Sequence, residues 1–109
     1  MSELVEAQQK FSGMLGLLLV HIAKETEYRV TLGESWRTPE QAAANAAKGI
    51  GILNSLHCER LAQDLNFFLG GKLVAPPAEI GEWWEQQGGA WGGRFGDPPH
   101  FSLAFGGRK

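Results

Sequence analysis

Two short stretches of the sequence carry side chains that bind metals. SLHCERLAQD, at residues 55–64, contains His57 and Asp64, and DPPH, at residues 97–100, ends in His100. Catalytic zinc sites use three protein ligands of the histidine and carboxylate type, because this leaves the fourth position open for water. The residue types therefore indicate a zinc site formed by His57, Asp64 and His100.

Asp97 is a carboxylate outside this ligand set. The prolines of DPPH restrict both themselves and the residues before them, so an extended segment or a turn would point Asp97 and His100 towards one place. A turn with Pro99 in its third position requires a cis peptide bond. Asp97 could take a proton from zinc-bound water, whose pKa the metal lowers to about 7. Spacing alone leaves open that the histidines are hydrogen-bonded core or surface residues and that Asp-Pro only opens a turn.

Three helices are predicted around these residues. Apolar residues at spacings of three and four indicate an amphipathic helix from residue 3 to about residue 25. A second helix follows Thr38, which is a typical N-cap, and ends at Gly49. APPAEIGEWWEQQGG, at residues 75–89, predicts a third helix with proline at its start and glycine at its end.

Alternation of apolar and polar residues predicts strands over 28–32, 60–68 and 100–105, and a glycine turn at 70–71 leads into KLV. In the strand over 60–68, Asp64 falls on the face opposite Leu65. The seven residues from His57 to Asp64 then require a loop before that strand. Strands joined by glycine turns and separated by helices predict an α+β fold, in which a small, mostly antiparallel sheet is flanked by helices.

Length and composition exclude several classes of protein. A chain of 109 residues is expected to form a single domain over residues 1–109. The net charge of −2, without a run of lysines or arginines, argues against nucleic acid as a partner. Cys58 is the one cysteine, so neither an intramolecular disulfide nor a cysteine-rich zinc site can form. MLGLLLV, at residues 14–20, is too short to span a membrane and lacks the flanks of a signal peptide.

Three blocks of the sequence resemble a known family. ESWRTPEQ (34–41), SLHCERLAQDLNFF (55–68) and WGGRFGDPPHFSL (91–103) are similar, in this order, to the signature blocks of the zinc D-Ala-D-Ala carboxypeptidase and L-alanyl-D-glutamate endopeptidase family. The similarity is greatest to the short forms encoded by bacteriophages and prophages. It implies the fold of that family, a small antiparallel sheet flanked by helices that is also found in Hedgehog signalling domains.

The resemblance implies a role for each matching residue. It makes His57, Asp64 and His100 ligands of Zn²⁺ and makes Asp97 the general base. Arg37 matches the arginine that stabilises the oxyanion or holds a substrate carboxylate, although an arginine here could also be a surface ion partner of Glu34 or Glu40. The resemblance also implies that Ser55 lines the substrate cleft.

The family also implies a function. The chain is expected to be a monomeric zinc metallopeptidase that hydrolyses the peptide stem of bacterial peptidoglycan as an L-Ala-D-Glu endopeptidase. A phage endolysin of this kind is made in the host cytoplasm and acts on the cell wall after its release. Two alternatives stay open at this point: a D-Ala-D-Ala carboxypeptidase or dipeptidase, and a non-catalytic module of a virion that binds the cell wall.

Overall fold

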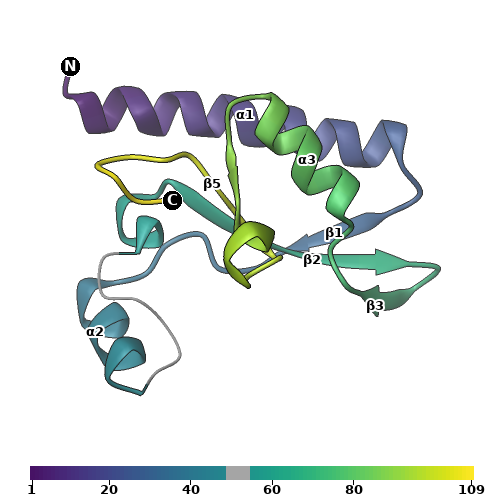
Figure 1. Cartoon of the computed structure of the whole chain (residues 1–109). Coiled ribbons are helices and arrows are strands. Elements are labelled where there is room, and N and C mark those ends of the chain that lie inside the picture. The colour runs from purple at the N-terminus through teal and green to yellow at the C-terminus, as the bar shows by residue number, and fades with distance from the viewer. Residues whose placement is uncertain (49–54) are drawn as a thin grey trace.

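Three α-helices occur in residues 1–48 and 55–109, the part of the chain that the computed structural model describes (Figure 1). They are α1 (Glu3–Glu25), α2 (Pro39–Ala47) and α3 (Ala78–Gln86). The three helices that the sequence predicts are therefore present. Thr38 caps α2, since its side chain accepts a hydrogen bond from the Gln41 N–H. The predicted end of this helix at Gly49 lies outside the described residues.

The strands of the described residues form a five-stranded antiparallel sheet in the order β1-β2-β5-β4, with β3 paired to β2. Together with the helices this confirms the predicted α+β class. The bounds of the strands are β1 (Arg29–Leu32), β2 (Ala62–Leu69), β3 (Lys72–Val74), β4 (Ala90–Trp91) and β5 (His100–Ser102).

Strands β2 and β5 each differ from the prediction at one end. A 3-10 helix, η1 (Leu56–Glu59), ends at Arg60 in the left-handed conformation with φ 57°, so β2 begins two residues after the predicted start at residue 60. Strand β5 ends at Ser102 instead of residue 105, because its last partner, Ala62, is the first residue of β2. Strand β4 is too short for alternation to indicate it, and η2 (Gly92–Phe95) follows it directly.

Helices α1 and α3 cover one face of the sheet and share a hydrophobic core with it. Trp84 of α3 lies at the centre and makes edge-to-face contacts with Phe11 of α1 and Phe101 of β5. Its indole N–H donates to the Ser102 carbonyl over 2.9 Å, so the polar end of the ring is also satisfied. The other buried members include Leu18, Ile22, Leu61, Leu65, Phe67 and Ile80.

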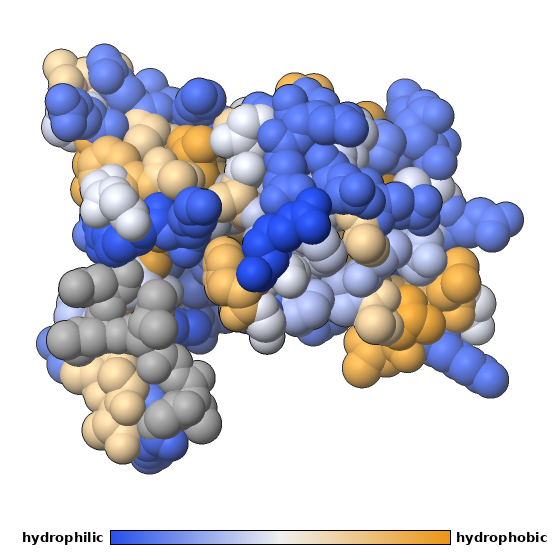
Figure 2. Space-filling view, viewed as in Figure 1, coloured by the Kyte–Doolittle hydropathy of each residue, from blue (hydrophilic) through white to orange (hydrophobic). Residues whose placement is uncertain are grey.

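The outer surface carries apolar side chains as well. Leu69 and Leu73 are exposed on the β2–β3 hairpin, where Figure 2 shows an apolar patch. Trp36 is also exposed, and the Arg60 guanidinium lies 4.9 Å from its ring centroid. Among the described helices, none combines the length and the hydrophobicity that crossing a membrane requires.

Candidate metal centre

Asp64 and His100 face each other across neighbouring strands. The antiparallel register of β2 and β5 places Asp64 directly opposite His100, so the two side chains lie on the same face of the sheet. Leu65, the next residue of β2, is fully buried in the core, and Asp64 therefore points away from the core as predicted. The His100 Nδ1 lies 3.7 Å from the Asp64 Oδ1.

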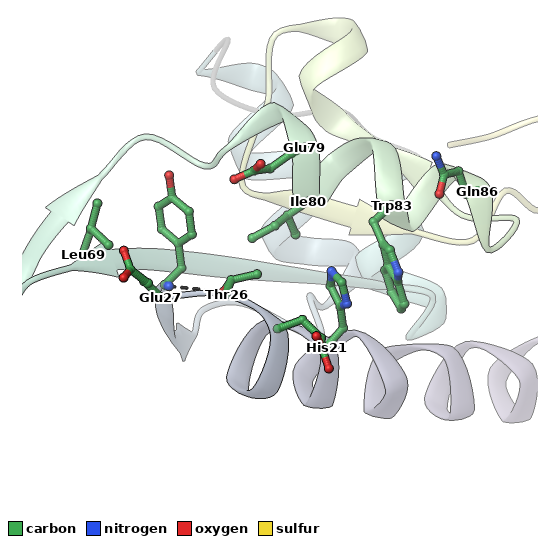
Figure 3. A pocket seen from close by; sticks show the side chains of 10 residues that line it. His21, Thr26, Glu27, Leu69, Glu79, Ile80, Trp83 and Gln86 are labelled. Atoms are coloured by element: carbon green, nitrogen blue, oxygen red, sulfur yellow. Dashed lines mark hydrogen bonds between the residues drawn. The ribbon is translucent and has the colours of Figure 1, made fainter.

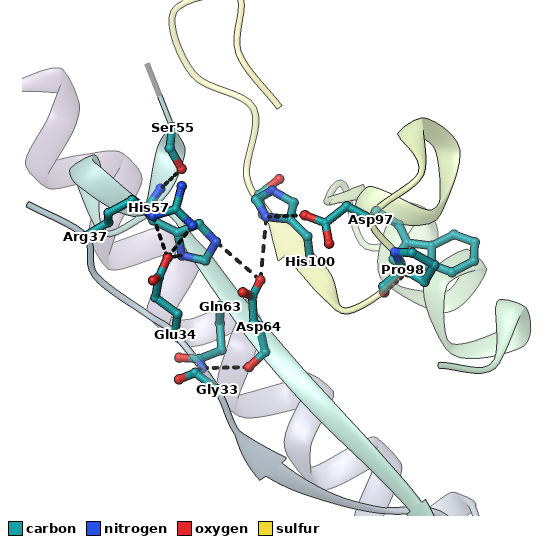
Figure 4. A network of polar contacts seen from close by, with 12 residues as sticks. Gly33, Glu34, Arg37, Ser55, His57, Gln63, Asp64, Asp97, Pro98 and His100 are labelled. Carbon is teal, nitrogen blue, oxygen red and sulfur yellow. Dashed lines mark hydrogen bonds and ion pairs between the residues drawn. The ribbon is translucent and has the colours of Figure 1, made fainter. Parts of the chain in front are cut away.

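The 3-10 helix η1 brings His57 to the same place. Ser55 caps this helix, and its hydroxyl accepts a hydrogen bond from the His57 N–H over 3.1 Å. The Arg37 N–H donates to the His57 carbonyl over 3.2 Å and fixes the turn from the other side. The His57 Nε2 then lies 3.3 Å from the Asp64 Oδ1 (Figure 4). Ser55 itself is buried, and its contact with a substrate stays a prediction.

His57, Asp64 and His100 form a group that could hold a metal ion, since one ligand atom from each lies within 4.8 Å of the others. Both histidines are buried. The Asp64 Oδ1 is buried too, and it has no hydrogen-bond partner among the described residues. Leaving a buried carboxylate oxygen unpaired is costly, and a cation between this oxygen and the two ring nitrogens would remove that cost. The donor set therefore fits a divalent metal.

The surroundings of His100 favour the form of the ring that binds metals. Burial lowers the pKa of His100 below its ordinary value of 6.5, and the neighbouring His57 acts in the same direction. The carboxylates of Asp97 and Asp64 oppose this lowering. Because a metal ligand must be the neutral imidazole, the lowered pKa of His100 keeps the ring ready to bind.

Asp97 lies at the exposed edge of the group. The DPPH segment forms a turn in which the His100 N–H donates to the Asp97 carbonyl over 3.0 Å. Its prolines have trans peptide bonds, so the expectation that such a turn needs a cis bond is wrong. The Asp97 side chain is 56% exposed, and its Oδ2 lies 3.9 Å from the His100 Nδ1. Asp97 is therefore beside the ligand group and open to solvent.

Arg37 reaches the group through Glu34. The Arg37 Nε donates to the Glu34 Oε1 over 2.7 Å, and the Nη2 pairs with the same oxygen. That oxygen also lies 3.7 Å from the His57 Nδ1. The ion pair weighed as an alternative for Arg37 is thus present, and a role of Arg37 in catalysis stays a prediction.

Sequence reasoning treated Glu34 only as a surface partner of Arg37 and missed its place beside His57. The backbone explains that place: the Asp64 N–H donates to the Glu34 carbonyl and the Gly33 N–H donates to the Asp64 carbonyl, each over 2.8 Å. These bonds continue the pairing of β1 with β2 beyond its last register pair. No sequence signal indicates this place, because the regular register of β1 and β2 would set Gly33 opposite Asp64, and Glu34 comes beside Asp64 only because its carbonyl accepts the Asp64 N–H.

A cavity of about 560 Å³ lies elsewhere, between the end of α1 and α3 (Figure 3). One wall is His21 stacked on Trp83, with ring centroids 4.3 Å apart. Carboxylates also line it: Glu25, Glu27 and Glu79. None of His57, Asp64 and His100 lies along this cavity, and His21 packs against an aromatic ring there.

No protein-family model matches the chain, and no curated protein matches it. The function must therefore be inferred from the centre and from the three sequence blocks. Two buried imidazoles and a carboxylate that can bind a divalent ion, beside an exposed second carboxylate, form an arrangement suited to metal-assisted hydrolysis.

Proposed function

We propose that this protein is a zinc metallopeptidase that cleaves the peptide stem of bacterial peptidoglycan. One observation carries the proposal: His57, Asp64 and His100 come from three separate elements and converge within 4.8 Å, with Asp97 at their exposed edge. The resemblance of the three sequence blocks supplies the substrate class. The blocks that carry these four residues are also those that resemble the peptidase family.

Zinc is the proposed metal of this centre. His57, Asp64 and His100 would supply three ligands, which is the number that catalytic zinc sites use while keeping one position open. The Asp64 side chain is 29% exposed, so solvent reaches the group from this side. Zinc held there would acidify water and polarise the carbonyl of the bond to be cleaved.

Asp97 is the proposed general base. Its carboxylate has no place among the three ligands, yet it lies next to the His100 nitrogen that faces Asp64. It would accept the proton of the attacking water and pass that proton to the amine that leaves. Because Asp97 is exposed, this proton transfer would take place on a side that a polymer can approach.

Arg37 is the proposed electrostatic partner of the reaction. Its guanidinium has five N–H donors, so it can keep Glu34 and still donate to a second acceptor. The negative charge that develops on the substrate carbonyl is one such acceptor. A carboxylate of the stem peptide is the other, and it would position the substrate instead of stabilising the transition state.

The bond between L-Ala and D-Glu is the proposed site of cleavage, and lysis of a bacterial host by a phage is the proposed setting. Both follow from the similarity to the short phage and prophage members of the family. The enzyme would then act on the wall after leaving the cytoplasm in which it is made, and as a monomer.

Digestion of purified peptidoglycan tests the proposal. The zinc-loaded protein should release fragments with a new N-terminal D-Glu, identified by mass spectrometry, and a chelator should stop this release. Loss of terminal D-Ala instead would indicate the carboxypeptidase or dipeptidase alternative. Binding to the wall without any new chain end, and without an effect of the chelator, would indicate the non-catalytic module and would overturn the proposal.

Matched variants make the result specific to the centre. Asp64→Asn should lose both zinc and hydrolysis, whereas His21→Ala, which removes a histidine outside the group, should retain both. Metal analysis of the purified protein is needed alongside, because two histidines and a carboxylate also bind iron in some enzymes. Hydrolysis that survives Asp64→Asn would contradict the assignment of the centre.

A further inference from the structure

We infer that Glu34 is a positioning residue that orients His57 towards the metal and holds Arg37 beside it. The inference rests on the proposed metal centre and adds a residue to it that does not itself bind the metal. It starts from the two nitrogens of His57, which face different partners. The Nε2 lies 3.3 Å from the Asp64 Oδ1, inside the ligand group, and the Nδ1 lies 3.7 Å from the Glu34 Oε1, outside it.

The Nδ1 of His57 is a buried polar atom in need of a partner. It has no hydrogen bond to any described residue, although the side chain is almost fully enclosed. A histidine that binds a metal through one nitrogen carries a proton on the other, and this N–H is almost always donated to a carboxylate, a carbonyl or water. Glu34 is the carboxylate placed to accept it, after a movement of less than 1 Å into hydrogen-bond range.

The backbone holds Glu34 where this role requires it. The Glu34 carbonyl accepts the Asp64 N–H over 2.8 Å, so the residue is tied to the strand that supplies a ligand. Arg37, three residues further on, is tied by its own N–H to the His57 carbonyl. The segment from Glu34 to Arg37 therefore runs along both ligand-bearing elements, η1 and β2 (Figure 4).

One oxygen of Glu34 contacts both Arg37 and His57. The Oε1 accepts from the Arg37 guanidinium and faces the His57 imidazole, so it fixes the tautomer of the ring and the direction of the guanidinium together. A surface ion pair would need only the first of these contacts. Because the Glu34 Oε1 also faces the His57 imidazole, we include Glu34 in the centre.

Zinc affinity, measured by competition with a chromogenic chelator, tests the inference without any assay of hydrolysis. Glu34→Ala should weaken zinc binding by about 10- to 100-fold, the usual effect of losing such an outer carboxylate. Glu34→Gln keeps an oxygen acceptor and should lose less. Glu40→Ala removes an exposed acid from the first turn of α2 and should leave zinc affinity unchanged.

The ¹⁵N-edited NMR signal of the His57 ring gives a second readout, which a purely structural role would not move. In the zinc-loaded wild type the Nδ1–H proton should exchange slowly with water, and in Glu34→Ala, with its circular dichroism unchanged, this signal should be lost. The inference is wrong if Glu34→Ala folds and keeps both the zinc affinity and the Nδ1–H signal. It is also wrong if the wild type binds no zinc. A wild type that binds zinc but does not cut peptidoglycan would defeat the proposed function and leave this inference standing.

Discussion

Asp64 and Asp97 show how the surroundings of a residue decide its role. Asp64 sits mid-strand between two imidazoles, and its buried oxygen lacks a hydrogen-bond partner among the described residues. Asp97 sits in a turn and is more exposed, and among the described residues it forms an ion-pair contact with His100 alone. The first carboxylate is therefore suited to a cation and the second to exchanging protons with water and substrate.

Replacing Asp97 by asparagine separates these two roles. Asp97→Asn removes the proposed proton acceptor but keeps the size of the side chain, so the proposed hydrolysis of peptidoglycan should fall by at least about 100-fold. The zinc content should not change, because Asp97 is outside the ligand set. Turnover and metal content measured on the same preparation check both parts. Full activity in Asp97→Asn would remove this residue from the mechanism.

The sequence predicts which side chains form the centre, but it predicts only some of the contacts around them. His57, Asp64 and His100 are rare chemistry-bearing side chains in blocks of recognisable spacing. That Asp64 would point away from the core followed from the alternation around it. Glu34 was not predicted as a part of the centre, because its place depends on two backbone hydrogen bonds beyond the last register pair of β1 and β2.

At the level of elements, Gly92 allows the DPPH turn to pack closely against η2, because it has no side chain. A Cβ on Gly92 would overlap the Asp97 carbonyl oxygen and lie 2.7 Å from the His100 Cβ. The Asp97 N–H also donates to the Gly92 carbonyl over 2.8 Å. The Trp91 indole N–H fixes the turn again through the Pro98 carbonyl. Asp97 and His100 are thus positioned by the junction of β4 and η2.

Gly92→Ala should therefore damage the centre without changing any of its functional groups. Backbone atoms cannot yield as a flexible side chain does, so we expect a loss of about 1–3 kcal/mol in the free energy of unfolding, together with weaker zinc binding. Urea unfolding and a zinc titration measure the two effects.

Gly13→Ala is the control for Gly92→Ala. Gly13 lies in α1, and apart from its neighbours and the backbone of that helix nothing lies within 4 Å of an added Cβ, so alanine should stabilise the helix by up to about 1 kcal/mol. A Gly92→Ala protein with the stability and zinc affinity of the wild type would contradict the role given to this junction.

An ion pair between α3 and η2 should make the stability of the fold depend on pH in the acidic range. The Glu85 carboxylate accepts two hydrogen bonds from Arg94, over 2.7 and 2.9 Å, and this contact lowers the pKa of Glu85 below its ordinary value of 4.5. The stabilisation is therefore present above that value and is lost as the pH falls through the lowered pKa. Since the pair is at the surface, the effect should be small.

Glu85→Gln removes this titration. Between neutral pH and about pH 3, the wild type should lose more stability than Glu85→Gln does, as measured by thermal unfolding across the pH series. In a background that already carries Arg94→Gln, the substitution of Glu85 should no longer alter the pH dependence. An equal pH dependence in the wild type and in Glu85→Gln would show that the pair does not contribute.

At the scale of the whole molecule, the sequence predicts the helices and strands better than it predicts which residues of different elements lie opposite each other. Caps and periodicity located α1, α2 and α3, since these are local signals. The register that sets Asp64 opposite His100 joins segments far apart in the chain and depends on the helices that pack on the sheet. Strand β4, with two residues, and η1, with four, are too short for a periodic pattern to indicate them.

Because the ligands belong to η1, β2 and β5, a metal ion would tie the fold together. An unfolded chain cannot hold the three groups in one place, so zinc should bind the folded state and stabilise it. At free zinc about 100 times above its Kd, the free energy of unfolding should rise by about 2.7 kcal/mol. For a chain of this size this corresponds to an increase in Tm of roughly 10 to 20 °C.

Thermal unfolding over a series of zinc concentrations measures the increase. Asp64→Asn should abolish the response and His21→Ala should preserve it, because only Asp64 belongs to the group. A Tm that does not depend on zinc would mean that the three side chains, close as they are, do not bind it.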